Sequence, residues 1–152
     1  MQDNIYEALR ASHEVQRTLC RKLVRATPAG DTRRRLCREL AEELAAHAAA
    51  EERYLYAPIL MDDMGLDPSR HALSEHHEID EEVEKLSSLD PSGEAWLTHA
   101  KKLSKLVHHH LKEEEKKFFQ ISGKILSDMQ KSQLAAKYRK DYRRMHTVLA
   151  AK

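Results

Sequence analysis

The sequence predicts an all-α protein: an up-down-up-down four-helix bundle followed by one additional C-terminal helix. Its 152 residues hold only four glycines and four prolines, and they are rich in the helix formers Ala, Leu, Glu, Lys and Arg. No run alternates apolar and polar residues as a half-buried strand would. A histidine followed 34 residues later by a His-x-x-x-Glu motif occurs twice, which indicates a duplicated helical hairpin. Two such hairpins give the four helices of a bundle.

The chain length predicts one domain with a single substantial core. We expect residues 1–126 to form the bundle and residues 127–152 to form a basic helix that packs on the same domain. The boundaries between the helices fall at clusters of Pro, Gly, Ser or Asp residues, which interrupt helical periodicity.

The first helix is expected to run from Asp3, its N-cap, to about Ala26, where a Pro-Gly segment interrupts the pattern. The second should open at Asp31 or Thr32. It must kink or end at Pro58, because proline removes a helical hydrogen bond and its ring clashes with the preceding turn. Both helices carry an apolar stripe, so both should face the core.

The third helix should start at Asp67, an N-cap with a proline directly after it, and reach about Leu86. The fourth should be capped by Ser92 and run to about Ser122 or Gly123. Short connections of this kind place consecutive helices antiparallel and adjacent.

A fifth helix is expected over residues 129–148, capped by Ser127 and Asp128. Between positions 131 and 152 the chain carries seven Lys or Arg residues and one Asp. We interpret this excess of positive charge as a solvated face, which we favour over a nucleic-acid surface because no groove-reading motif accompanies it.

Charge and hydropathy exclude other classes of protein. The formal net charge is +1, and no apolar run approaches the roughly 20 residues of a transmembrane helix. The first ten residues do not resemble a signal peptide. Cys20 and Cys37 are too few for a disulfide framework and too far apart for a Cys-x-x-Cys motif. We therefore expect no membrane partner and a location in the reducing cytoplasm.

The repeat selects six residues as candidate metal ligands. The imidazole and the carboxylate of a His-x-x-x-Glu motif leave one face of a helix about one turn apart. A carboxylate on an apolar stripe costs several kcal/mol to bury unless it is paired, protonated or bound to a metal. The repeat brings four helices to one constellation, which consists of His13, His47, Glu51, His76, His110 and Glu114.

Periodicity selects one residue from each run of adjacent histidines. On the third helix the apolar stripe centres near His76, whereas His77 points about 100° away. Asp80 shares the His76 face one turn on, so it is a seventh candidate, as a metal ligand or as a hydrogen-bond partner. In the histidine triple on the fourth helix only the last member, His110, faces the core, and we interpret the other two as solvated surface.

Four histidines with two or three carboxylates suit a borderline first-row ion such as iron, manganese or zinc. Six ligands exceed what one tetrahedral zinc requires, and two ions bridged by Glu51 and Glu114 would use them all. Ferritin-like di-iron bundles need Glu-x-x-His, and no histidine here has a carboxylate three residues before it. The alternative is a plain structural bundle, since a lone histidine on an apolar stripe is more often a hydrogen-bonded core residue.

The order His, His-x-x-x-Glu, His, His-x-x-x-Glu over four helices resembles the hemerythrin HHE cation-binding family. The resemblance covers roughly residues 5–125 and extends to two local strings, Glu51-Glu52-Arg53-Tyr54-Leu55-Tyr56 and Glu75-His76-His77-Glu78-Ile79-Asp80. It implies that the six residues from the repeat ligate a non-haem di-iron centre, in which the two glutamates bridge the ions together with an oxo or hydroxo group. Manganese or zinc are the substitutes that it allows.

The resemblance further implies that O2 or a similar small ligand binds at the centre. The family's oxygen carriers have His-x-x-x-His on the third helix and an Asp five residues after the last motif histidine, whereas this chain has Asp80 and Glu114, with Glu115 at five residues. One iron would then have fewer nitrogen donors, which favours sensing, iron handling, or peroxide and nitric oxide chemistry over oxygen carriage. A second interpretation is a metal-stabilised regulatory module that binds a partner through the basic C-terminal helix.

Overall fold

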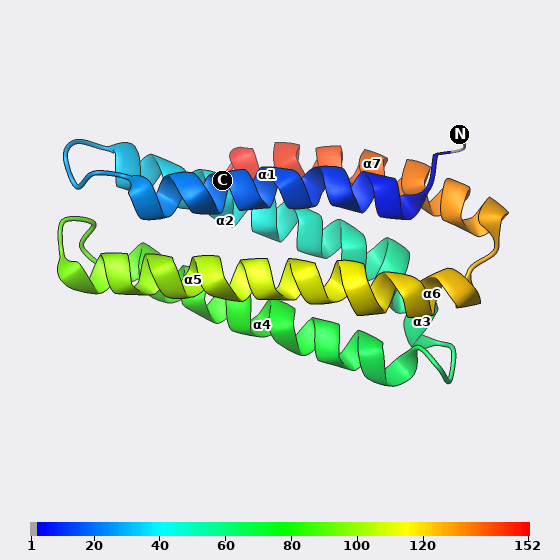
Figure 1. Ribbon diagram of the computed structural model, residues 1–152. Coiled ribbons are helices and arrows are strands. Elements are labelled where there is room, and N and C mark those ends of the chain that lie inside the picture. Colours follow the sequence, from blue (N-terminus) through cyan, green and yellow to red (C-terminus); the bar gives the residue numbers. More distant parts are fainter. Residues whose placement is uncertain (1–2) are drawn as a thin grey trace.

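The computed structural model describes residues 3–152, and every regular element in that range is helical (Figure 1). Four long antiparallel segments form a bundle. They begin with α1 (Ile5–Arg25), α2 (Thr32–Glu51), α4 (Leu66–Ser88) and α5 (Glu94–Glu113). A further helix, α7 (Asp128–Ala150), lies along α1 and α2. The predicted fold class, a four-helix bundle with an additional C-terminal helix, is confirmed.

Two of the bundle segments contain a π-helical stretch. After α2, η1 (Glu52–Tyr56) leads into α3 (Ala57–Leu60), and after α5, η2 (Glu114–Phe118) leads into α6 (Phe119–Ile125). Pro58 falls in the first turn of α3, where a missing N–H costs little. The chain therefore stays helical through Pro58, and α3 ends two residues later, at Leu60, close to the end that was expected there. η2 contains no proline, so the shared feature of the two stretches is their position at the end of a His-x-x-x-Glu motif.

Three predicted caps are wrong. Asn4 caps α1, because its side-chain oxygen accepts hydrogen bonds from two backbone N–H groups of the first turn. The predicted cap Asp3 instead pairs with α7. Asp67 lies inside α4, which begins one residue earlier. Ser92 donates to Asp90 in the preceding turn, and α5 begins two residues after Ser92.

The cap at the start of α7 is as predicted. The Ser127 side chain accepts a hydrogen bond from the backbone N–H of Gln130, whose side chain in turn accepts one from the N–H of Ser127. This reciprocal arrangement is a capping box. It starts α7 directly after the short connection from α6, so that the helix folds back over the bundle (Figure 1).

The bundle contains two apolar cores with a polar layer between them. Along α1, Ile5 and Leu9 belong to one core, His13 lies in the layer, and Cys20 and Leu23 belong to the other core. The same sequence of core, layer and core recurs along the other segments. The polar layer consists of His13, His47, Glu51, His76, His110 and Glu114.

The two cysteines, Cys20 and Cys37, are free and buried in one of the apolar cores. Burial raises the pKa of the Cys20 thiol to about 12, so this thiol stays protonated. Across residues 3–152, none of the helices combines the length and the apolar character that crossing a membrane requires.

Ion pairs help to hold α7 on the bundle. The carboxylate of Asp141, which is 6% exposed, lies 2.7 Å from Arg53 of η1 and 2.8 Å from Arg144 of α7 itself. Arg139 pairs with Asp3 at the start of the chain. Part of the positive charge predicted for the solvated face of this helix is therefore used within the chain.

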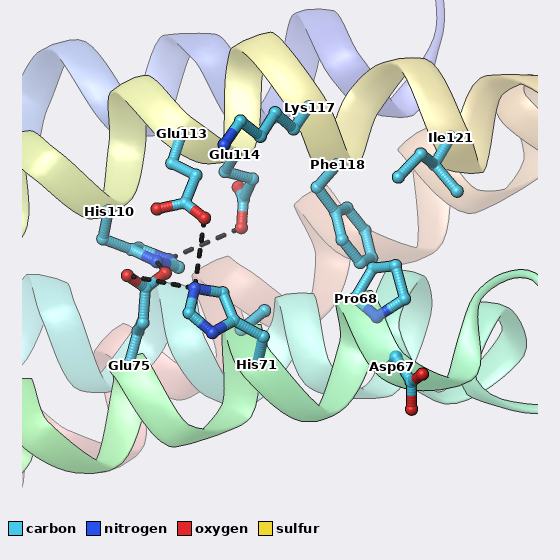
Figure 2. A pocket seen from close by; sticks show the side chains of 11 residues that line it. Asp67, Pro68, His71, Glu75, His110, Glu113, Glu114, Lys117, Phe118 and Ile121 are labelled. Atoms are coloured by element: carbon cyan, nitrogen blue, oxygen red, sulfur yellow. Dashed lines mark hydrogen bonds and ion pairs between the residues drawn. The ribbon is translucent and has the colours of Figure 1, made fainter.

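A pocket of about 270 Å³ opens between α4 and the segment formed by α5, η2 and α6 (Figure 2). Pro68, Phe118 and Ile121 supply apolar wall, and the pocket reaches two members of the polar layer, His110 and Glu114. The layer is therefore approached from this side of the bundle through an apolar opening.

Candidate metal centre

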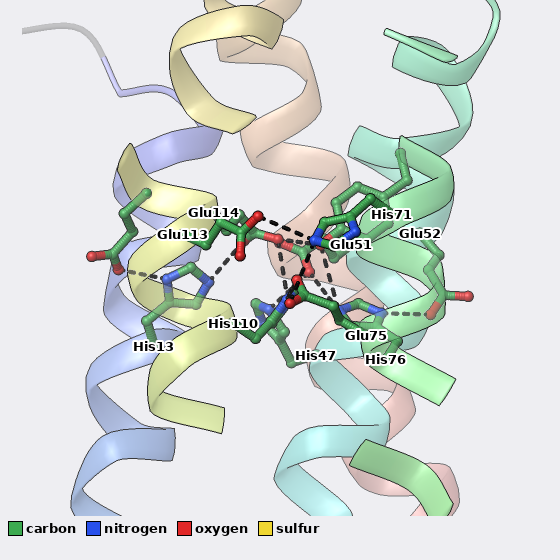
Figure 3. A network of polar contacts seen from close by, with 12 residues as sticks. His13, His47, Glu51, Glu52, His71, Glu75, His76, His110, Glu113 and Glu114 are labelled. Carbon is green, nitrogen blue, oxygen red and sulfur yellow. Dashed lines mark hydrogen bonds and ion pairs between the residues drawn. The ribbon is translucent and has the colours of Figure 1, made fainter. Parts of the chain in front are cut away.

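Six of the seven predicted site residues meet in the polar layer midway along the bundle (Figure 3). Each hairpin contributes one histidine from its first helix and a His-x-x-x-Glu motif from its second. All six side chains are buried, and none is more than 7% exposed. The helical spacing of four residues places each motif's imidazole and carboxylate on the same face, which explains why the motifs point into the bundle.

The six residues form two donor groups that share both carboxylates. The first donor group is His13, His47, Glu51 and Glu114, and the second donor group is His76, His110, Glu51 and Glu114. Within each group, one ligand atom per residue lies within 4.8 Å of the others. This arrangement has room for two ions, one in each group, with the carboxylates between them.

The contacts inside the layer show how the carboxylates are shared. Oε1 of Glu51 is 3.2 Å from Nε2 of His47 and 3.2 Å from Nε2 of His76. Oε1 of Glu114 is 3.1 Å from Nε2 of His13, and its Oε2 is 3.5 Å from Nε2 of His110. Each carboxylate thus contacts one histidine from each hairpin.

Most of the inward-facing atoms have no hydrogen-bond partner among residues 3–152. The unpartnered atoms are Nε2 of His13, His47 and His110, both carboxylate oxygens of Glu51, and Oε1 of Glu114. Buried polar atoms of native proteins are almost always hydrogen-bonded, because an unpaired one costs free energy. Imidazole nitrogens and carboxylate oxygens are ligands of first-row metal ions. The donor set and its unpartnered atoms therefore fit a pair of cations.

Outside the layer, each histidine is held through its other ring nitrogen. We call the four residues that contact these Nδ1 atoms the outer partners. The distances are 2.6 Å from His13 to Glu115, 2.7 Å from His47 to Tyr138, 2.8 Å from His76 to Glu52 and 2.8 Å from His110 to Glu75. A proton on Nδ1 that is donated to these oxygens leaves the Nε2 lone pair free to point into the layer.

The outer partners follow the duplication, with one exception. Residues 63 positions apart correspond between the two hairpins, so Glu52 and Glu115 are equivalent. The residue that corresponds to Glu75 is Ser12, which cannot reach across to a histidine as a carboxylate would. Tyr138 of α7 fills this place, and its hydroxyl lies 2.6 Å from the Ser12 hydroxyl. The additional helix therefore completes the hydrogen bonding of the first donor group.

A second departure from symmetry concerns an aromatic pair. The Tyr56 hydroxyl donates a short hydrogen bond to Glu114 and lies 3.4 Å from Nε2 of His76. Burial and the charge of Glu114 raise the pKa of Tyr56, so the phenol keeps its proton. The corresponding residue, Phe119, stacks on His13 at 5.9 Å between ring centroids. Within residues 3–152, Tyr56 thus places a phenol against a shared carboxylate, whereas the Tyr138 phenol contacts the outer ring nitrogen of His47.

Asp80, the seventh predicted site residue, lies outside both donor groups. Its side chain is exposed, and it lies at the edge of a cavity of about 10 Å³ that touches His47, His76 and His110. A cavity of this size holds about one water-sized sphere. The amide nitrogen of Gln16, a buried residue that also lines it, has no hydrogen-bond partner among residues 3–152.

The neighbouring histidines point away from the layer, as periodicity predicted. His77 is 74% exposed and lies 2.7 Å from Glu81. His108 contacts the carbonyl of Ser104, one turn back on its own helix, and His109 is 68% exposed. The histidine that helical periodicity predicted to face the core is therefore the buried one in each run.

Sequence reasoning missed the outer partners and Tyr56. Glu52 and Glu115 each directly follow a layer glutamate, so the doubled glutamate was a usable signal. Glu75 and Tyr138 gave no such signal, because they reach histidines that lie 35 and 91 residues away in the chain. Contacts of this length depend on how the helices pack.

The fold and the layer define a helical bundle built around a buried cation-binding site. The family model described as the hemerythrin HHE cation binding domain matches residues 4–121, so the chain belongs to that family. The crystal structure of a hemerythrin HHE cation binding domain-containing protein from Mycobacterium kansasii is similar, with a TM-score of 0.84 at 23% identity, over 95% of this chain and 88% of that one. That similarity supports the fold. Among curated proteins, no relative matches the sequence.

The first prediction concerns the pH dependence of metal affinity. Burial would lower the pKa values of His13 and His76, but hydrogen bonds and charges from the nearby glutamates raise them to about 9 and about 10. At pH 7 both are therefore protonated in the metal-free protein, and the ion that binds in each donor group must displace one of these protons. The apparent affinity for each ion should rise by up to about tenfold per pH unit between pH 7 and 9. Chelator competition across this range measures it, and a flat profile would contradict the assignment.

The second prediction concerns Tyr138. The Tyr138→Phe variant lacks the hydroxyl that contacts Nδ1 of His47. The ion in the first donor group should therefore bind about 10–100-fold more weakly. Tyr142→Phe is the matched control, because Tyr142 also lies on α7 and its hydroxyl donates to Glu43 of α2 at 2.6 Å, with no hydrogen bond to a layer residue among residues 3–152. Chelator titrations of the two variants compare them. Equal losses in both would show that the effect comes from α7 packing.

Proposed function

We propose that the chain binds two iron ions in the polar layer, bridged by Glu51 and Glu114, and that this centre binds or reacts with O2 or a related small ligand. The observation that carries the proposal is the set of unpartnered inward-facing atoms, arranged in two donor groups with shared carboxylates. Manganese or zinc are possible substitutes. The expected setting is a reducing cytoplasm, in which Cys20 and Cys37 remain free thiols.

The number of donors supports a reactive centre over a purely structural one. Each donor group offers two imidazole nitrogens and one oxygen from each shared carboxylate. Structural zinc sites are closed by four ligands, whereas six-coordinate iron or manganese would keep open positions in each group. Ferrous ions held by these residues would supply the electrons that O2, peroxide or nitric oxide chemistry requires.

The cavity beside the histidines supports binding of a ligand no larger than a few atoms. Leu44 and Ile79 give it apolar wall, which keeps bulk water from the layer. Gln16 lies against it with a free amide nitrogen, so this side chain would donate a hydrogen bond to a small ligand. Asp80 at the edge adds negative charge, which would disfavour anions at the entrance.

The surroundings favour reaction or sensing over bulk oxygen carriage. The Tyr56 phenol holds a proton next to Glu114, and Gln16 supplies a second polar group on the other side of the histidines. With two shared carboxylates and two histidines, each donor group would place more negative charge around an ion than a histidine-rich set would. Negative charge stabilises ferric over ferrous iron, and a ferric resting state does not suit reversible carriage.

A second candidate function follows from Tyr138. The hydroxyl of this residue contacts Nδ1 of His47, so an ion bound in the first donor group would change the position or the hydrogen bonding of the basic helix α7. A regulatory module that presents α7 to a partner according to its metal status would use this contact. Lys131, Arg139 and Arg144 are paired with carboxylates of residues 3–152, which leaves Lys137, Lys140 and Arg143 of α7 for such a partner.

The third prediction tests the metal content. Protein purified without oxygen should contain about two irons per chain, and adding O2 or azide should change its visible spectrum. His76→Ala should lose at least one ion, because it removes a nitrogen of the second donor group. His77→Ala, one residue on and exposed, is the control and should keep both. Loss of iron in the His77 variant with retention in the His76 variant would refute the proposed ligand set.

A further inference from the structure

A second cluster of donors lies outside the polar layer, on the face between α4 and α5. The ligand atoms of His71, Glu75 and Glu113 all lie within 4.8 Å of one another. Nε2 of His71 is 3.1 Å from Glu113, and Nε2 of His109 is 3.1 Å from the other oxygen of the same carboxylate. We call His71, Glu75, His109 and Glu113 the outer cluster. Figure 2 shows three of its members at the pocket.

The internal repeat shows that this cluster is not required by bundle packing. The residues 63 positions earlier are Ala8, Ser12, Ala46 and Ala50. All four are buried, on the two helices that α7 lies along. Where a helix covers this face the residues are small. The equivalent face of the second hairpin carries two imidazoles and two carboxylates instead.

The outer cluster is joined to the polar layer through one residue. Oε1 of Glu75 is 2.8 Å from Nδ1 of His110, while its Oε2 is 3.6 Å from His71 and 3.9 Å from His109. The two oxygens of a single carboxylate therefore face the two sites. Glu75 alone would therefore connect an ion held by the outer cluster to His110 of the second donor group.

The pocket beside the cluster is also lined by two residues of the layer. His71, Glu75 and Glu113 line it together with His110 and Glu114. His110 and Glu114 are buried, and each has an atom without a hydrogen-bond partner among residues 3–152. Three residues of the outer cluster and two residues of the second donor group therefore line the same opening.

We infer that the outer cluster binds a divalent first-row cation and loads it into the polar layer. Two imidazole nitrogens and two carboxylates suit ferrous, manganous or zinc ions. An exposed ion pair alone contributes little to stability, and His77 with Glu81 on the same helix is an example. The outer cluster differs from it because two histidines share one carboxylate and a second carboxylate faces both. Only the loading step rests on the proposed function.

Stoichiometry tests the site. Titration of metal-free protein with zinc against a chromophoric chelator should show three ions per chain. The double variant His71→Ala/His109→Ala should bind two, and the control His77→Ala should bind three. The same number of ions in the double variant and in the unmodified chain would overturn the outer site. If the unmodified chain binds one ion that the double variant lacks, the outer site stands and the proposed layer centre fails.

Kinetics test the loading step. Ferrous uptake into metal-free protein, followed without oxygen by stopped flow, should slow about tenfold or more in the double variant, while its final iron content in the layer stays at two. The control should load at the unmodified rate. An unchanged uptake rate in the double variant would overturn loading through this cluster.

Discussion

Burial of four imidazoles and two carboxylates between two apolar cores is the constraint on which the rest of this structure depends. Such groups are costly to remove from water unless they are paired or bound to a cation. Interactions on both sides of each imidazole ring offset this free-energy cost. Outer partners hold every Nδ1 atom, and the Nε2 atoms converge with the carboxylates on two groups that fit metal ions.

The two halves of the duplicated bundle have diverged around this shared layer. In the first half, small residues let α7 pack, and Tyr138 takes the role that Glu75 has in the second half. In the second half the face stays open, and the phenol of Tyr56 replaces the phenyl ring of Phe119. The first donor group is thus covered by a helix, whereas the second has a phenol that donates to Glu114 and a pocket that opens beside it.

The sequence predicted the fold class and the residues that meet in the layer, because both follow from helical periodicity and from the repeat. Helix ends were predicted less well. Asn4 and Asp3 are neighbours with similar capping ability, and the N-cap position of α5 is Gly93, which has no side chain to mark it. Asp80 lies about 40° round the helix from His76, at the edge of the stripe, and it is outside both donor groups. Glu75 and Tyr138 depend on interhelical packing, which periodicity does not specify.

The most direct test of the account is a crystal structure of the iron-loaded protein with anomalous diffraction data collected at the iron edge. We expect two peaks in the polar layer, one bounded by His13 and His47 and the other by His76 and His110, with Glu51 and Glu114 each contacting both ions. A single ion, or two ions that do not share the carboxylates, would contradict the account.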